Sequence, residues 1–228
     1  MTSQLLDLSH RIEPAMFTHP GLPGPTWKPF RTREQYRESS GTDFQIDQVT
    51  MVGNTGTYLD SPFHRFADGG DLASVPLTAV ADLSAFVVDA RQTGRGVGAD
   101  ALADALGDAT AKDALEGAAV LLLTGGDRAW GGEAYAQDAP FLTAEGAAWL
   151  VTHRPALVGI DSVNIDDLAD QTRPAHTQLL GAGVLILEHL TGLAALPTRG
   201  ARLHAAPPPW NGVGTWPVRA YALVPGEA

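Results

Sequence analysis

The pattern of hydrophobic and polar residues predicts strands that alternate with helices through the middle of the chain. Apolar runs rich in branched side chains predict buried strands over 82–90, 118–126, 156–162 and 184–190. Helical spacing predicts helices over 98–106, 143–153 and 174–183, and the Ala-rich stretch 99–119 predicts one or two surface helices. Strand-like segments at both ends cover 5–12, 44–52 and 217–224. This order predicts a mixed α/β fold rather than a doubly wound sheet.

One segment interrupts this pattern near the N-terminus. Residues 13–30, EPAMFTHPGLPGPTWKPF, contain five prolines and two glycines and predict a long loop. Loops of this length usually cover a site or reach a partner, and this one carries Trp27 and Phe30. No repeat or linker divides the rest, so the 228 residues predict a single domain.

Composition narrows the classes of function. The net charge of −11 argues against nucleic acid, whose phosphates require a basic surface. No run approaches the ~20 apolar residues that a membrane helix needs, and no secretory signal is visible, so we expect a cytoplasmic protein. The chain has no cysteine, so any bound metal needs ligands from His, Asp, Glu or water.

The stretch GNTGTYLDSPFHRF, residues 53–66, concentrates the candidate chemistry. Asp60 lies before a Ser-Pro pair that disfavours helix at Ser61, and its carboxylate can cap a helix, bind a metal or accept a proton. His64 adds an imidazole four residues later, and a helical turn after Pro62 would bring the two side chains together. Asp60 and His64 alone are weak evidence of a functional site. They indicate one only if other polar side chains from elsewhere in the chain lie beside them.

A second pair lies far along the chain. His176 is in the predicted helix PAHTQLLGAG, and Glu188 follows the apolar residues VLIL. A carboxylate drawn into an apolar strand is costly unless a metal or an acid–base partner compensates it. An edge-strand glutamate near a surface histidine is the alternative.

These segments resemble, in order and over nearly the whole chain, the cyclase-like metal-dependent hydrolase family that includes kynurenine formamidases and isatin hydrolases. The resemblance implies the swivelling β/β/α fold, with a mixed sheet around a barrel-like core, and a homo-oligomer, either a dimer or a tetramer. The family's loop reads His-x-Gly-Thr-His-x-Asp-x-Pro-x-His, and here Asn54 and Tyr58 replace its two leading histidines. A carboxamide and a phenol are poor metal ligands, so the family's two-metal centre is not expected here.

The resemblance assigns roles to individual residues. It implies that Asp60, His176 and Glu188 are ligands of one divalent ion, zinc or manganese, and that His64 is a general acid/base. Asn54 and Thr57 are expected to contact a small-molecule substrate, with Trp27 and Phe30 as aromatic walls, from the same or a neighbouring subunit.

Three functions remain open on these residues. The first is hydrolysis of an amide, lactam or lactone in a small cyclic or aromatic molecule by metal-activated water. The second is a metal-free cyclase, dehydratase or isomerase in which His64, Tyr58 and Glu188 perform acid/base chemistry, with Tyr58 as an oxyanion donor. The third is a binding protein that has kept the fold without catalysis.

Overall fold

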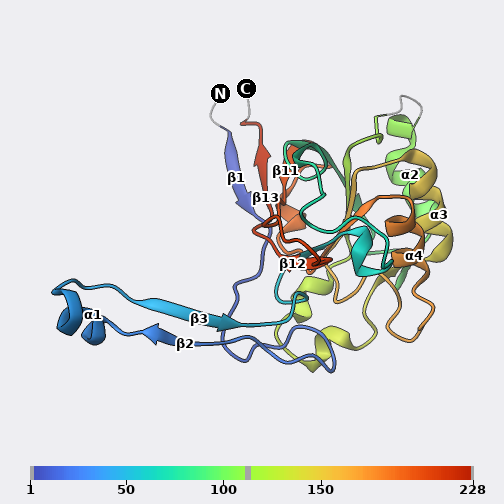
Figure 1. Ribbon diagram of the computed structural model, residues 1–228. Coiled ribbons are helices and arrows are strands. Elements are labelled where there is room, and N and C mark those ends of the chain that lie inside the picture. Colours follow the sequence, from blue (N-terminus) through green and yellow to red (C-terminus); the bar gives the residue numbers. More distant parts are fainter. Residues whose placement is uncertain (1–2, 111–113, 227–228) are drawn as a thin grey trace.

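The computed structural model describes residues 3–110 and 114–226, and one large mixed sheet organises them (Figure 1). The strands of this sheet are β1 (Gln4–Asp7), β4 (Tyr58–Asp60), β5 (Leu83–Asp89), β7 (Ala119–Leu123), β9 (Leu157–Ile160), β10 (Leu185–Glu188), β11 (Arg199–His204), β12 (Thr215–Pro217) and β13 (Tyr221–Val224). Their order is β1-β13-β11-β5-β7-β9-β10-β4-β12, in a curled, half-barrel sheet. The four central strands, β5, β7, β9 and β10, run parallel, and the strands on either side join antiparallel. The mixed α/β fold expected from the sequence is thereby confirmed.

Three helices cover one face of the sheet: α2 (Ala99–Thr110), α3 (Ala144–His153) and α4 (Pro174–Gly181). Each connects two neighbouring parallel strands, because parallel pairing requires a long crossover. Along β7, Val120 and Leu122 pack in the core cluster beneath the helices, whereas Leu121 packs in the cluster on the opposite face. Both faces of the central strands are therefore buried, which explains their nearly continuous apolar sequence.

Short elements complete the body. They are the strand pair β6 (Gly96–Val97) and β8 (Phe141–Leu142), and the 3-10 turns η1 (Pro62–His64), η2 (Leu77–Ala79), η3 (Gly126–Ala129), η4 (Glu133–Ala136) and η5 (Leu193–Ala195). No helix among the described residues is both long enough and apolar enough to cross a membrane.

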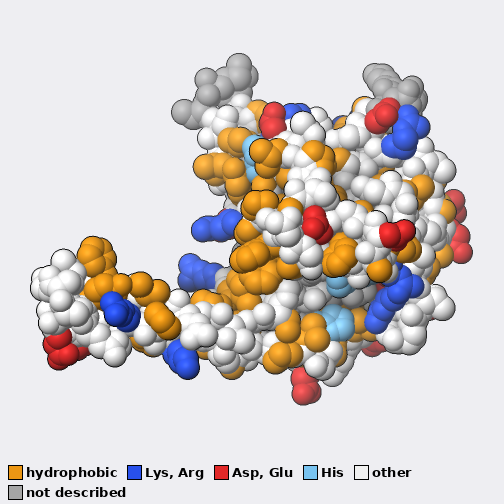
Figure 2. All heavy atoms as spheres, in the orientation of Figure 1, with side chains coloured by type: hydrophobic (Ala, Val, Ile, Leu, Met, Phe, Trp, Pro, Cys, Tyr) orange, Lys and Arg blue, Asp and Glu red, His pale blue; other side chains and the backbone are white. Residues whose placement is uncertain are grey.

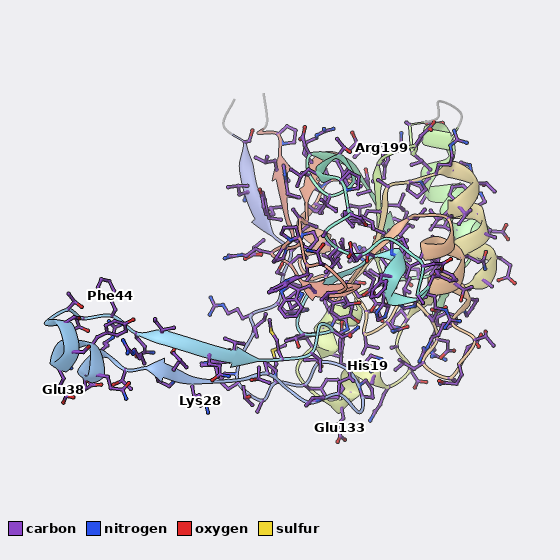
Figure 3. The ribbon with its side chains drawn as sticks, viewed as in Figure 1. His19, Lys28, Glu38, Phe44, Glu133 and Arg199 are labelled. Atoms are coloured by element: carbon purple, nitrogen blue, oxygen red, sulfur yellow. The ribbon has the colours of Figure 1, made fainter. Side chains whose placement is uncertain are left out.

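An arm projects from the body (Figure 1). It consists of β2 (Thr26–Arg31), α1 (Arg33–Ser40) and β3 (Ile46–Thr50), and we call residues 26–50 the arm. Its two strands pair only with each other, and every residue of β2 and β3 is exposed. Figure 3 shows Lys28, Glu38 and Phe44 pointing from the arm into solvent. The arm therefore adds nothing to the core of its own chain.

The central elements agree with the sequence-based expectations, and the two ends do not. The predicted loop 13–30 ends early because β2 begins at Thr26, and the predicted strand 44–52 lies in the arm rather than in the main sheet. The predicted strand 217–224 is split, since β12 pairs with β4 at one edge while β13 pairs with β1 near the other. Helix α1 was not expected. Of the Ala-rich stretch 99–119, α2 covers residues up to 110, and 111–113 lie outside the described residues.

Candidate active site

Strand β4 brings the two halves of the predicted site together. It pairs antiparallel with β10, so that Tyr58 lies opposite Glu188 and Asp60 lies opposite Ile186. Pro62 cannot continue the strand, and it begins the 3-10 turn η1, which folds His64 back toward Asp60. His64 Nδ1 is 4.0 Å from Asp60 Oδ1. Within the stretch 53–66, the loop 53–57 therefore leads into the short strand β4 and then into the tight turn η1.

Asp60 is completely buried, with its two oxygens in different surroundings. Oδ1 accepts a hydrogen bond of 2.5 Å from the hydroxyl of Thr215, its neighbour on β12. Oδ2 has no hydrogen-bond partner among the described residues. Burial alone would raise the pKa of Asp60, but His64, His176 and the Thr215 hydroxyl lower it. An ionised, buried oxygen without a donor is well suited to a cation.

Thr215 also fixes the tautomer of His64. The Thr215 oxygen lies 2.6 Å from His64 Nδ1, and its single proton is donated to Asp60, because an ionised carboxylate can only accept. Nδ1 of His64 must therefore donate to Thr215, which leaves the lone pair of a neutral imidazole on Nε2. Glycine is required beside this contact, since a Cβ at Gly214 would lie 2.7 Å from His64 Cα.

His176 is held by Asp166, a residue that the sequence reading missed. Asp166 accepts hydrogen bonds from the backbone N–H groups of Ala175 and His176, at 2.6 and 3.1 Å, and lies 2.6 Å from His176 Nδ1. This leaves Nε2 facing Asp60 Oδ2 at 3.7 Å and Glu188 Oε1 at 3.8 Å. Burial would lower the pKa of His176, but the Asp166 hydrogen bond and the charges of Glu188 and Asp60 raise it to about 10.

Glu188 is buried at the end of β10 and is held by two donors. The backbone N–H of Ile165 donates to Oε1 at 2.5 Å, and the Tyr58 hydroxyl donates to Oε2. Burial is the main cause that raises the pKa of Glu188 to about 7, although His176 and both hydrogen bonds oppose the rise. Tyr58 is itself fully buried, and burial together with the charge of Glu188 raises the pKa of its phenol.

The donor atoms on either side of His176 Nε2 are spaced as ligands of one divalent ion. In a tetrahedral site with bonds of about 2.1 Å, two ligand atoms lie about 3.4 Å apart. The two separations at His176 Nε2 exceed this value by only a few tenths of an ångström. The Asp166 contact on Nδ1 is the second-shell arrangement typical of metal-binding histidines. Among the described residues, the three whose ligand atoms all lie within 4.8 Å of one another are Asp60, His64 and His176, and Glu188 approaches this group through His176 Nε2. A second ion does not fit equally well, because Tyr58 donates its proton to Glu188.

A pocket of about 380 Å³ opens above these groups, which is a suitable size for a small molecule. Of the residues predicted from the sequence, it is lined by Asn54, His64, His176 and Glu188. Asp60 and Tyr58 lie buried beneath them. The Thr57 hydroxyl is also buried, where it donates to the His189 carbonyl at 2.6 Å, so the structure gives Thr57 a backbone contact rather than a pocket position.

Trp27 and Phe30 do not reach this pocket within one chain. Both lie on β2 of the arm, with 42% and 68% of their surfaces exposed. The expected aromatic walls are absent from the pocket lining because the chain turns away from the body at Thr26.

The sequence reading also missed Asn164 and Thr215. Asn164 lines the pocket, and its Oδ1 accepts from the Asp166 backbone N–H at 3.0 Å, so its own amide N–H groups stay available. The dense polar run DSVNIDD after a buried strand was the available signal for Asn164 and Asp166. Thr215 had no such signal, because its role follows from a strand pairing across 155 residues.

Comparison with known proteins agrees with this geometry. The Cyclase family model matches residues 6–167. A kynurenine formamidase of Geobacillus thermodenitrificans is 28% identical, covering 96% of this chain and 97% of the relative.

Solved structures share the fold. An isatin hydrolase bound to the product analogue thioisatinate superposes with a TM-score of 0.84 at 20% identity, covering 98% of this chain and 93% of the other. A predicted metal-dependent hydrolase from Bacillus stearothermophilus gives a TM-score of 0.75 at 24% identity, covering 98% and 99%. These matches confirm the resemblance seen in the sequence and the expectation of an enzyme. The chain belongs to the cyclase family.

Proposed function

We propose that this enzyme hydrolyses a C–N or C–O bond next to a carbonyl, in an amide, lactam or lactone of a small cyclic or aromatic molecule, with one divalent ion held by Asp60, His176 and Glu188. The observation that carries the proposal is the position of His176 Nε2, which lies 3.7 Å from Asp60 Oδ2 and 3.8 Å from Glu188 Oε1, beside a pocket that His176 and Glu188 line. The names of the relatives, a kynurenine formamidase and an isatin hydrolase, support cleavage of this kind of bond.

Each residue has a distinct task in this reaction. A divalent ion, zinc or manganese, supplies Lewis acidity and lowers the pKa of water when it is bound. His64 Nε2 removes a proton from the attacking water and returns it to the leaving nitrogen or oxygen, while Thr215 and Asp60 hold the imidazole through Nδ1. Asn164 offers amide N–H donors to the substrate carbonyl oxygen. Tyr58 keeps Glu188 in place from behind.

Elemental analysis of protein purified without added metal tests the proposal. We expect about one zinc or manganese per chain, and loss of both the ion and hydrolysis after strong chelation. Re-addition of the ion should restore the rate towards lactones, lactams and formamides. Activity that survives complete removal of the ion contradicts the metal-dependent mechanism.

A metal-free acid/base enzyme is the second candidate, and one observation favours it. His176, with its pKa raised to about 10, forms a cation between Asp60 and Asp166 and so balances the buried carboxylates without an ion. In that case the buried Tyr58 acts only through Glu188, because it does not line the pocket. Turnover in the chelated enzyme, abolished in His64→Gln, is the result that this candidate requires.

We also propose a homo-oligomer, either a dimer or a tetramer, that forms through the arm. Five large apolar residues are exposed there: Trp27, Phe30, Phe44, Ile46 and Val49. Figure 2 shows hydrophobic side chains along the arm and on the part of the body that faces it across a notch. A patch of this kind on an isolated hairpin favours burial against another molecule. Cytoplasmic location and the lack of a nucleic-acid partner stay predictions.

A further inference from the structure

We infer that the substrate carries a carboxylate, and that Arg65 and Arg173 bind this group at the mouth of the pocket. The inference deepens the proposed hydrolysis and depends on it for the identity of the site. It concerns the end of the substrate that does not react, and it therefore adds specificity rather than chemistry.

The charge of the pocket lining differs from the charge of the whole chain. The protein carries 26 acidic against 15 basic residues. The pocket lining reverses this balance, because it contains the two guanidiniums of Arg65 and Arg173 against the single carboxylate of Glu188. Figure 2 shows histidine side chains at the surface beside lysine or arginine side chains on this side of the body. A local reversal of charge in an acidic protein favours an anionic ligand.

Neither guanidinium has an acidic partner among the described residues. Among the described residues, Arg65 and Arg173 form no ion pair within 4.0 Å, although seven other arginines do. The charge of Arg173 helps to lower the pKa of Asp170, but the carboxylate of Asp170 accepts its hydrogen bonds from Thr172. An arginine without a carboxylate at a pocket is available for one that the ligand brings.

Hydrogen bonds fix the side chains of Arg65 and Arg173. Arg65 donates from Nε to the Thr177 hydroxyl at 3.1 Å and from Nη2 to the Thr172 carbonyl at 3.2 Å. Arg173, the next residue after Thr172, donates from Nη1 to the Asp167 carbonyl at 3.1 Å. A guanidinium has five N–H groups, so most donors on both remain available. Both guanidiniums are thus anchored by neutral oxygens of the segment 167–177.

The backbone of Arg173 adds to this picture. Its φ of 53° lies in the left-handed region, which a residue with a side chain adopts at a cost. This conformation precedes Pro174 at the start of α4, two residues before Ala175 and three before the metal-site residue His176. His19, on the loop before the arm (Figure 3), completes the rim; burial is the main cause that lowers its pKa, and the charge of Arg173 lowers it further. The same turn therefore places the proposed metal ligand His176 and the proposed anion-binding residue Arg173 on one wall of the pocket.

Matched substrates test the inference. The probes are formanilides that carry a carboxylate through zero, one, two or three methylenes, each compared with its methyl ester. The scissile formamide is the same in both, so the ratio of their kcat/KM values reports on the anionic group alone. We expect the best carboxylate to exceed its ester, and the ratio to fall about tenfold in Arg65→Gln and in Arg173→Gln, mainly through KM. The preference should also shrink as salt rises from 0.05 to 0.5 M.

Three comparisons make the result specific. Arg65→Lys and Arg173→Lys retain the charge and should recover part of the ratio. Arg91→Gln removes an arginine that is already paired with Asp89 and should leave the ratio unchanged. Equal rates for acid and ester at every linker length, or a ratio unchanged in both Gln variants, overturn the inference while the hydrolysis proposal stands.

Calorimetry separates this outcome from failure of the proposed hydrolysis. If no formanilide is cleaved, the aniline carboxylate with the same linker series is titrated into the metal-loaded wild type and into the Arg65→Gln/Arg173→Gln variant. Binding that weakens about tenfold or more in the double variant supports the anion site without hydrolysis. Binding that is absent from the wild type, or equal in both proteins, overturns it.

Discussion

The arm and the active site hold their side chains in opposite ways. In the site, Tyr58 contacts Glu188 across 130 residues and Thr215 contacts Asp60 across 155. In the arm, Thr32 caps α1 through Gln35, and the Arg33 and Arg37 side chains bond to Asp43 only a few residues away. The site therefore exists only when the whole sheet has formed, whereas the arm is organised by its own neighbours.

This contrast indicates what each region lacks. The site is buried and polar, and Asp60 Oδ2, which has no hydrogen-bond partner among the described residues, is suited to binding a cation. The arm is exposed and partly apolar, and what it lacks is a surface to cover Phe30 and Phe44. If metal binding and assembly are independent, substitutions in the arm should leave metal binding unchanged, and substitutions in the site should leave the oligomer unchanged.

The largest effect is expected from His176→Ala. Removal of Nε2 takes away the proposed ligand that lies near both Asp60 and Glu188, so the ion should be lost and hydrolysis should fall by about 1000-fold, as expected for several kcal/mol of lost Lewis-acid stabilisation. Elemental analysis and initial rates measure these changes, and light scattering should show an unchanged oligomer. His176→Gln controls for a folding defect. Full metal content in both variants would remove His176 from the ligand set.

The double variant Phe30→Asp/Phe44→Asp, in the arm, should have the opposite effect: it should weaken the oligomer and leave metal binding unchanged. Burial of each phenylalanine contributes about 1.5–3 kcal/mol, so losing both should weaken assembly by roughly 100-fold or more. Sedimentation over a concentration series should show smaller particles with one ion per chain still bound. Glu38→Gln, also on the arm, is the matched control and should assemble normally. A wild type that is monomeric at all concentrations would refute the homo-oligomer.

A smaller effect is expected from Asp166→Asn, which tests how far the site's organisation extends. Asp166 accepts from Ala175, from His176 N–H and from the imidazole, so its loss should free the ring and reduce metal affinity about 10- to 100-fold. Competition with a chromophoric chelator measures this affinity. Asp167→Asn changes the adjacent carboxylate, which pairs with exposed Arg95, and should bind metal as the wild type does. Equal affinities in the two variants would show that His176 needs no orienting partner.

The same contrast explains how much the sequence could predict. Local periodicity predicts the four central strands and the helices between them, and the structure contains these elements. The family motif predicts four site residues, and in the structure His64, His176 and Glu188 line one pocket with Asp60 buried beside them. Thr215 and Asp166 were missed because their roles depend on pairing and turn geometry that no local pattern carries. The sequence predicts Trp27 and Phe30 in a loop that covers the site, but the structure has them on the projecting arm. The content of proline and glycine does not distinguish these two arrangements.

The smallest expected effect is a difference of one proton in the number released when the metal binds at pH 6 and at pH 8.5. It depends only on residues of the active site. Without the ion, Glu188 has its pKa raised to about 7 and His176 to about 10, so both hold a proton at pH 6. Ligands must be deprotonated, and Asp60, whose pKa is lowered, already is. Binding should therefore release about two protons per ion near pH 6 and about one near pH 8.5, where Glu188 is ionised and His176 is not yet neutral. Affinity should rise with pH, more steeply below pH 7 than above it.

Calorimetric titration in buffers of different ionisation enthalpy counts these protons. Glu188→Gln cannot supply a proton from residue 188, so any ion it still binds should release about one at both pH values. The arm variant Phe30→Asp/Phe44→Asp should match the wild type at each pH, because no titrating group of the site lies on the arm. A proton count that changes with the arm variant would mean that the oligomer reshapes the buried network, and the separation of the two regions would fail. Release of fewer than one proton at pH 6 would instead place a neutral His176 and an ionised Glu188 in the free enzyme, with the site already arranged for the ion.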